Sequence, residues 1–186
     1  MGRIAYPNLE DIRDPAILEV LDRAKRVGTP RPESQALRAW VPDVLKTFSE
    51  AWEKTFVEGV VDHGLKELCR LYVTKTVDCG YCGAQRSSFA ERRDEAVLDD
   101  LINFRKSDNF TEREKLALIY TDSIVWDSEI ATDDDWARLN ALFTEPELVE
   151  LGFFIALTSG QQRWIKTLRL NHFEVLAEET TGVVLP

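Results

Sequence analysis

Apolar residues recur along most of the chain at intervals of three and four positions, the spacing that places side chains on one face of an α-helix. The alternating apolar and polar positions and the Asn-Gly turns that indicate β-hairpins are missing. The clearest apolar stripe predicts a helix that ends near Val77, and it comprises Leu65, Leu68, Cys69, Tyr72, Val73 and Thr76. The pattern therefore predicts an all-α protein.

Local sequence signals predict where several helices begin. Asp14 before Pro15 is typical of a helix start, and Gly28 would end that helix. Capping boxes pair a threonine with an acidic residue three positions later, and they occur at Thr111 and Glu114, Thr132 and Asp135, and Thr144 and Glu147. They predict helices near 112–128, 133–142 and 145–158.

Two further segments complete the expected bundle. A long helical segment runs from about residue 34 to 56, and Pro42 should bend or divide it. A last apolar-rich segment covers 160–177. Since no internal repeat or clear linker interrupts the 186 residues, we predict one compact helical domain over 61–186, with an N-terminal helical arm over 1–60 packed on it.

Composition narrows the range of partners. The chain is 44% hydrophobic and 30% charged, a balance typical of globular proteins. Its 33 acidic residues outnumber its 23 basic ones, and the net charge of -10 should repel nucleic acid and anionic lipid surfaces. No apolar run has secretory or membrane-spanning length. We therefore expect a cytoplasmic protein without a nucleic-acid or membrane partner.

The stretch DCGYCGAQRSS, residues 78–88, is the main candidate for chemistry. A cysteine becomes a good nucleophile only when ionised, and the free N–H groups of a helix start favour the thiolate. Asp78 is the predicted N-cap, which would place Cys79 and Cys82 in or beside the first turn. Two sulfurs at this spacing can also close a small disulfide, so the pattern predicts a redox pair in which Cys82 is held as the anion.

Two other readings of the cysteines remain open. Cys79 and Cys82 could be inert core residues, as we expect Cys69 to be from its place on the apolar stripe. A zinc site would need four ligands, and the candidates beside the pair are Cys69, His63 and His172, at spacings unlike those of zinc fingers. No βαβ pattern surrounds the motif, which argues against a thioredoxin fold.

The region around the cysteines resembles the carboxymuconolactone decarboxylase and alkylhydroperoxidase D superfamily. The resemblance rests on ELCRL from Glu67, the interval of twelve residues from Glu67 to Cys79, and CGYCGAQRS from Cys79, and it extends over about 61–127. It implies an all-α, alkylhydroperoxidase D-like bundle that forms homo-oligomers and reduces hydroperoxides. It implies no cofactor and no metal, but it does imply a thiol or disulfide electron donor.

The resemblance also implies residue roles. Cys82 would attack the hydroperoxide and Cys79 would resolve the resulting sulfenic acid as a disulfide. Glu67 matches the family glutamate, and Tyr81 matches the residue between the cysteines; either could pass a proton to the leaving alcohol.

Arg86 departs from the family pattern, which has histidine four residues after the second cysteine. Arginine has no acceptor lone pair and cannot shuttle a proton, although it can favour a thiolate nearby. Arg86 is expected one helical turn from Cys82, with Ser87 and Ser88 after it in the same helix. If this helix and the one before it form an antiparallel hairpin that turns near residues 76–78, Glu67 and Arg86 lie equally far from the turn and face one another. We therefore expect a Glu67–Arg86 ion pair beside Cys82, with either a catalytic or a purely structural role.

Three functions follow from these observations. The first is a thiol-dependent peroxidase, in which His63 on the face of Glu67 could replace the missing base or could simply be a hydrogen-bonded surface residue. The second is a decarboxylase of the lactone branch, which an intact cysteine pair and a shortage of histidines disfavour. The third is a non-catalytic or redox-sensing helical oligomer.

Overall fold

The structure, a computed structural model, describes residues 2–27 and 29–172. Helices make up most of this range. The α-helices are α1 (Pro15–Arg26), α2 (Pro32–Arg38), α3 (Pro42–Trp52), α4 (His63–Val77), α5 (Gly80–Gly83), α6 (Glu95–Asp99), α7 (Glu112–Val125), α8 (Asp133–Leu142) and α9 (Glu145–Leu168). Short 3₁₀ or π segments lie at η1 (Leu9–Asp11), η2 (Glu53–Val57) and η3 (Asp100–Asn103). The prediction of an all-α protein is confirmed.

Side chains cap the helices where the sequence predicts a start. Asp14 accepts a hydrogen bond from the backbone N–H of Ala16 ahead of α1. Each of the three capping boxes forms both of its hydrogen bonds, ahead of α7, α8 and α9. These bonds satisfy N–H groups that have no partner inside a helix. Gly28 lies outside the described residues, and α1 itself ends at Arg26.

Two predicted boundaries have different outcomes. Pro42 divides the segment over 34–56, because proline lacks an N–H and fits only the first turn of α3. The predicted boundary near residue 158 is wrong, since α9 runs through Gly160 without a break. Burial of Ile155 and Ile165 on either side of that glycine outweighs its helix cost of about 1 kcal/mol. The predicted segment beyond residue 172 lies outside the described residues.

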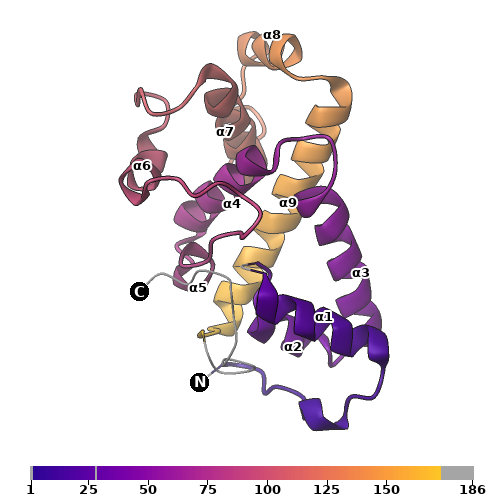
Figure 1. The fold of residues 1–186 in the computed structure, drawn as a ribbon. Helices are drawn as coiled ribbons and strands as arrows, with labels where there is room; N and C mark the ends of the chain where they lie inside the picture. The colour runs from indigo at the N-terminus through magenta and orange to yellow at the C-terminus, as the bar shows by residue number, and fades with distance from the viewer. Residues whose placement is uncertain (1, 28, 173–186) are drawn as a thin grey trace.

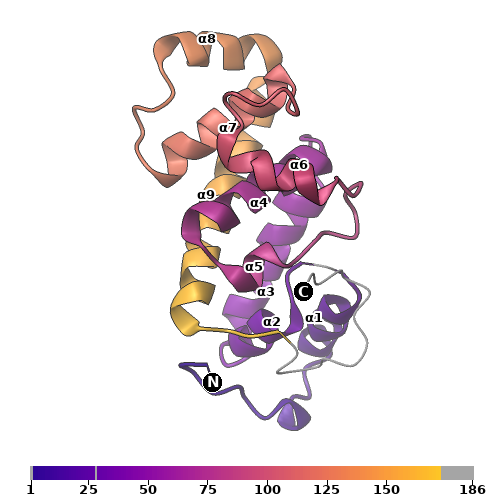
Figure 2. The same cartoon turned by 90° about the vertical axis from the view of Figure 1, so that its left-hand side faces the viewer.

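Helices α4 and α9 run side by side through the molecule, and α7 packs against both (Figure 1). Their facing apolar side chains form the main core, to which α8 adds Leu139 and η3 adds Leu101. The view turned by 90° shows α6, α7 and α8 towards one end of the α4–α9 pair and α1 and α2 at the other (Figure 2). The turn that carries Cys79 and leads into α5, the helix of Cys82, is here called the cysteine turn. It lies at the end of the α4–α9 pair that is nearer to α1 and α2.

The N-terminal helices pack on each other and on the rest of the bundle. Helices α1, α2 and α3 share a small core formed by Ile17, Leu21, Ala36, Ala39 and Leu45. Leu37 belongs to the apolar cluster that also contains the cysteine pair, and Trp52 packs with Phe154 of α9. These contacts place α2 next to the cysteine turn and α3 against α9.

Candidate functional site

The cysteine turn joins the end of α4 to the short helix α5. Asp78 follows Val77 in the left-handed conformation, with φ 53° and ψ 51°, and is the C-cap of α4. The prediction that Asp78 is the N-cap of the next helix is therefore wrong. Aspartate tolerates the left-handed conformation that ends a helix, and this moves the N-cap one residue along the chain. Cys79 takes that place, and its sulfur accepts a hydrogen bond from the Cys82 N–H at 3.3 Å.

Both sulfur-bearing residues are buried and reduced. Cys79 is 4% exposed and Cys82 is 2% exposed, and neither forms a disulfide in this structure. The two thiols interact, since each shifts the pKa of the other. They therefore lie close to one another, as a disulfide between them would require.

The two thiols have opposite pKa shifts. The hydrogen bond from the Cys82 thiol lowers the pKa of Cys79, and the Cys82 backbone N–H, Lys166 and Arg70 add to this effect. The same bond to Cys79, together with burial, raises the pKa of Cys82 well above its ordinary value. The expectation that Cys82 is held as the anion is therefore wrong, because the helix start and the shared proton favour the thiolate at Cys79.

Arg70 is a buried cation beside the cysteine pair, and the sequence-based predictions include no role for it. Its guanidinium binds Glu67 at two points, 2.6 and 2.8 Å, and donates to the carbonyl oxygens of Cys82 at 3.1 Å and Gln85 at 2.8 Å. Burial alone would lower the pKa of Arg70, but the Glu67 carboxylate raises it overall. Arg70 thus fixes the backbone after Cys82 and supplies positive charge close to both sulfurs. The sequence signal for the Glu67–Arg70 ion pair was that the two residues lie three positions apart on one helix.

Arg86 does not pair with Glu67, so that prediction is wrong. Helix α5 ends at Gly83, which places Arg86, Ser87 and Ser88 in a loop rather than in the helix of Cys82. Arg86 instead binds the Glu95 carboxylate, at 3.1 and 2.6 Å, and donates to the carbonyl oxygen of Gly83 at 2.6 Å. Its contacts close the loop after α5.

The Tyr81 hydroxyl bonds to a residue outside the cysteine pair, so it is not placed to donate a proton to the pair. The hydroxyl donates to Glu33 of α2 at 2.8 Å, and the ring stacks on His172 with centroids 4.1 Å apart. Burial raises the pKa of Tyr81 well above its ordinary value, and the Glu33 charge adds to this effect. Tyr81 therefore ties the cysteine turn to α2.

His63 joins α4 to the loop after α5. The Phe56 carbonyl can only accept, so Nδ1 donates to it at 2.7 Å, and Nε2 accepts the hydroxyl of Ser87 at 2.8 Å. The backbone N–H of Ser87 donates in turn to Glu67 at 2.9 Å. Burial lowers the pKa of His63, which keeps the ring neutral. Both ring nitrogens are thus engaged with residues other than the cysteines.

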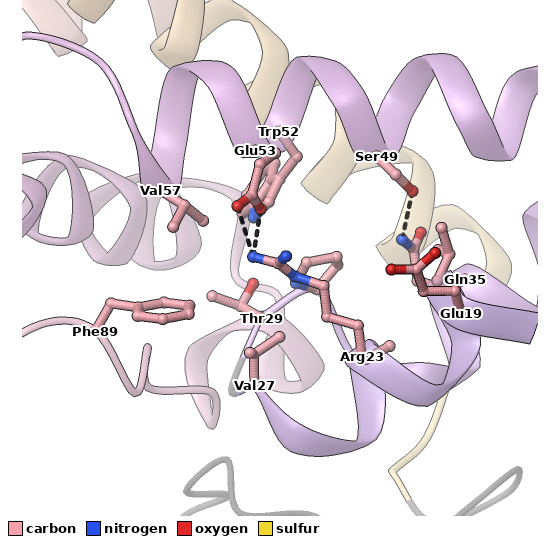
Figure 3. A pocket seen from close by; sticks show the side chains of 13 residues that line it. Glu19, Arg23, Val27, Thr29, Gln35, Ser49, Trp52, Glu53, Val57 and Phe89 are labelled. Atoms are coloured by element: carbon pink, nitrogen blue, oxygen red, sulfur yellow. Dashed lines mark hydrogen bonds and ion pairs between the residues drawn. The ribbon is translucent and has the colours of Figure 1, made fainter. Parts of the chain in front are cut away.

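Three cavities lie near these residues. Cys82 lines a small one of about 10 Å³, together with Arg70, Trp52, Gln161 and Gln162 among others. A second cavity of about 180 Å³, here called the arm cavity, lies among α1, α3, the Thr29–Pro30 segment and Phe89 (Figure 3). A third, of about 190 Å³, is lined by Glu67 and by the loop that contains Arg86. Cys82 thus lines one of these three cavities.

Within residues 2–27 and 29–172, no group of three or more His, Cys, Asp or Glu side chains is placed to hold a metal ion. Cys69 lies in the main core with its sulfur fully buried, as the sequence predicts. In the same part of the chain, every helix is too short or too polar to cross a bilayer.

Comparison with known proteins yields structural matches alone. No protein-family model matches the chain, and no curated protein matches it in sequence. An uncharacterised peroxidase-related protein from Ralstonia eutropha JMP134, with an alkylhydroperoxidase AhpD core, has a TM-score of 0.69 at 20% identity, over 91% of this chain and 92% of its own. A putative AhpD antioxidant defence protein from Agrobacterium tumefaciens has a TM-score of 0.61 at 20% identity, over 73% of this chain and 94% of its own.

A third structural match comes from a protein with a different described activity. The debrominase Bmp8 has a TM-score of 0.70 at 16% identity, over 89% of each chain, and a cysteine-to-alanine variant of it is known in complex with 2,3,4-tribromopyrrole. At such low identities the likeness concerns the fold. The resemblance seen in the sequence is confirmed at that level: this chain has the alkylhydroperoxidase D-like helical fold.

Proposed function

We propose that this chain is a thiol-dependent, peroxidase-type oxidoreductase, in which Cys79 and Cys82 cycle between dithiol and disulfide as a hydroperoxide is reduced. The observation that supports this most is the Cys79 sulfur at the start of α5, which accepts the N–H of Cys82 at 3.3 Å beside the buried guanidinium of Arg70. Because Cys82 lines a cavity, it is the sulfur that meets the substrate.

In the first step the Cys82 sulfur attacks the terminal oxygen of the hydroperoxide, and its proton passes to the Cys79 thiolate. Cys79 then does the work of a base, which Arg86 cannot do because it has no lone pair. The S–O bond forms and the O–O bond breaks, so Cys82 becomes a sulfenic acid and the alkoxide takes a proton from water.

In the second step the Cys79 sulfur attacks Cys82, water leaves and a disulfide forms. Over both steps the hydroperoxide gains two electrons and two protons to give an alcohol and water, and the dithiol becomes a disulfide. A thiol or disulfide electron donor must then reduce the pair by exchange. This chemistry fits a cytoplasmic homo-oligomer in which residues 1–60 form an arm on the domain over 61–186.

A second candidate function is a redox sensor that oxidises without turnover. It is favoured by the burial of both sulfurs, 4% and 2% exposed, and by the engagement of Glu67 with Arg70 and with the Ser87 N–H. A sensor would consume about one equivalent of hydroperoxide per chain, whereas an enzyme would continue as long as reductant is present.

The test is hydroperoxide consumption with excess dithiothreitol by the wild type, Cys82→Ser, Cys79→Ser and the control Cys69→Ala. We expect many turnovers by the wild type and by Cys69→Ala, and only the background rate for Cys82→Ser. Cys79→Ser should lose turnover, since it lacks both the proton acceptor and the resolving thiol. Equal rates for the wild type and Cys82→Ser would refute the peroxidase proposal, and a single equivalent of consumption would favour the sensor.

A further inference from the structure

Three residues that line the small cavity at Cys82 carry buried polar atoms that the described part of the protein leaves without hydrogen bonds. The atoms are Trp52 Nε1, Gln161 Oε1 and Gln162 Oε1. Trp52 and Gln162 are each 2% exposed. A buried polar atom without a partner is unfavourable, so a ligand that satisfies one is favoured here.

The orientation of Gln162 is fixed by its other atoms. Its Nε2 donates to the Arg70 carbonyl at 3.1 Å and to the Thr158 hydroxyl at 3.1 Å. These bonds leave Oε1 as an acceptor. The residues that line the cavity therefore offer one unpartnered N–H donor, from Trp52, and unpartnered carbonyl acceptors from the two glutamines. Its volume of about 10 Å³ suits a group about the size of a water molecule.

The arm cavity lies directly behind this small site. Trp52 and Thr29 line both cavities, so they form the wall between them. Val20, Ala24 and Val27 supply apolar lining from the N-terminal arm, and Phe89 supplies more from the loop after α5.

The polar side chains of the arm cavity are largely paired with one another. Arg23 binds both oxygens of Glu53 at 2.6 Å, and Gln35 donates to Ser49 at 3.0 Å. In Figure 3 the Arg23–Glu53 pair lies between Phe89 on the left and the Gln35–Ser49 bond on the right. The surface of the arm cavity that a ligand can still contact is therefore mainly apolar.

We propose that the two cavities form one ligand site, in which the arm cavity holds a compact, uncharged apolar body and Trp52 directs a small donor–acceptor head group to Cys82. The ligand passes between Trp52 and Thr29. Trp52 is then a positioning and specificity-determining residue, since its indole N–H binds the head group and its ring bounds the space for the body. This inference rests on the proposed function for the identity of the head group, which would be the –OOH of an organic hydroperoxide.

The test uses an unreactive probe, 2-phenyl-2-propanol, which has an apolar ring and a hydroxyl that both donates and accepts. Its binding to the reduced full-length protein is measured by calorimetry, and its protection of Cys82 against iodoacetamide is measured by peptide mass mapping. The variants are Trp52→Phe, which removes the N–H but keeps an aromatic ring, and Val20→Phe, which fills the arm cavity. Trp126→Phe and Val149→Phe are the matched controls, on exposed residues away from both cavities.

We expect the probe to bind the wild type and both controls and to slow the labelling of Cys82. Trp52→Phe should weaken binding about two- to tenfold, the usual effect of losing one neutral hydrogen bond. Val20→Phe should weaken it by at least about tenfold, because the added ring clashes with the probe. Thermal melting of each variant shows whether it is folded, and Ala24→Met fills the same cavity should Val20→Phe not fold.

Three results would overturn the proposal: no binding to the wild type, unchanged binding in both cavity-filling variants, or binding that leaves the labelling rate of Cys82 unaffected. Binding with protection of Cys82 but without hydroperoxide turnover has a different meaning. It would refute the peroxidase function and leave the ligand site in place.

Discussion

Cys69 and Cys79 are almost equally buried, yet their surroundings shift their pKa values in opposite directions. Cys69 is 0% exposed in the main core, and burial raises its pKa to about 12. Cys79 is 4% exposed, but its pKa is lowered by hydrogen bonds from Cys82 and by the charges of Lys166 and Arg70.

The difference shows that burial alone does not decide whether a cysteine is reactive. What distinguishes the pair is a helix start that points an N–H at one sulfur, a second thiol that shares its proton, and a cation in the same low-dielectric surroundings. Cys69 has only a hydrogen bond with Thr121 to oppose the cost of burying a charge. A mutation that removes one of these three features should make Cys79 more like Cys69.

The largest expected effect is the contrast in labelling between the two regions. A pKa of about 12 leaves Cys69 at least about a thousandfold poorer in thiolate at pH 7 than an ordinary cysteine, whereas Cys79 is richer. Native-state alkylation followed by peptide mapping should therefore modify Cys79 at least about a thousandfold faster than Cys69. Labelling of all three cysteines only on global unfolding would show that the pair is as inert as Cys69.

The second-largest expected effect concerns the buried cation Arg70. Arg70→Met would leave the Glu67 carboxylate buried without its partner, so we expect the free energy of unfolding to fall by about 3–5 kcal/mol. Lys54→Met breaks the exposed pair with Glu58 and is the matched control, with no measurable loss expected. Denaturant unfolding measures both. A loss for Arg70→Met no larger than the control would mean that Arg70 does not hold the turn.

Prediction from the sequence succeeded where the determinants are local. A capping box such as Thr111 with Glu114 needs only two side chains three residues apart, and all three boxes formed as predicted. The core position of Cys69 was also predicted from spacing alone. These are properties of one helix or one turn.

The predictions were wrong where a residue had more than one possible partner. Glu67 could meet Arg70 on its own helix or Arg86 in a later segment, and the sequence gives no measure of which guanidinium lies closer. The N-cap of α5 was mispredicted for the same reason. Both Asp78 and Cys79 could cap this helix, and only the position where α4 ends decides between them. The arm cavity could not be foreseen, because its walls come from α1, α3 and Phe89, which are far apart in the chain.

A smaller effect tests whether His63 belongs to the thiol site. Burial holds the pKa of His63 below its unfolded value of 6.5, so the unfolded chain binds the proton more readily. The stability from this group is complete above pH 6.5 and is lost as the pH falls towards the folded pKa, at no more than about 1.4 kcal/mol per pH unit for one proton.

His63→Gln should therefore flatten the pH dependence of unfolding below pH 6.5 and leave the labelling rates of Cys79 and Cys82 unchanged. A wild-type-like pH slope in the variant would argue against a neutral, buried His63. A changed labelling rate would instead place His63 in the proton path of the pair.

The smallest effect comes from Lys166, whose ammonium group donates to the Val77 carbonyl at 2.7 Å and is partly exposed. Lys166→Met should raise the pKa of Cys79 slightly, since an interaction with a partly exposed charge is worth about 0–1 kcal/mol. The difference from the wild type should vanish at high salt, where exposed charges are screened. Labelling of Cys79 at two ionic strengths measures it, and a salt-independent difference would contradict this explanation.

The central claim is that the pKa of Cys79 is lowered and that of Cys82 is raised by their mutual interaction. The most direct measurement is the rate of iodoacetamide labelling at each cysteine as a function of pH, read by peptide mass mapping of the reduced wild type. The account predicts that Cys79 titrates below an ordinary cysteine, and that Cys82 and Cys69 both titrate well above one. A lower pKa for Cys82 than for Cys79, or three indistinguishable curves, would contradict it.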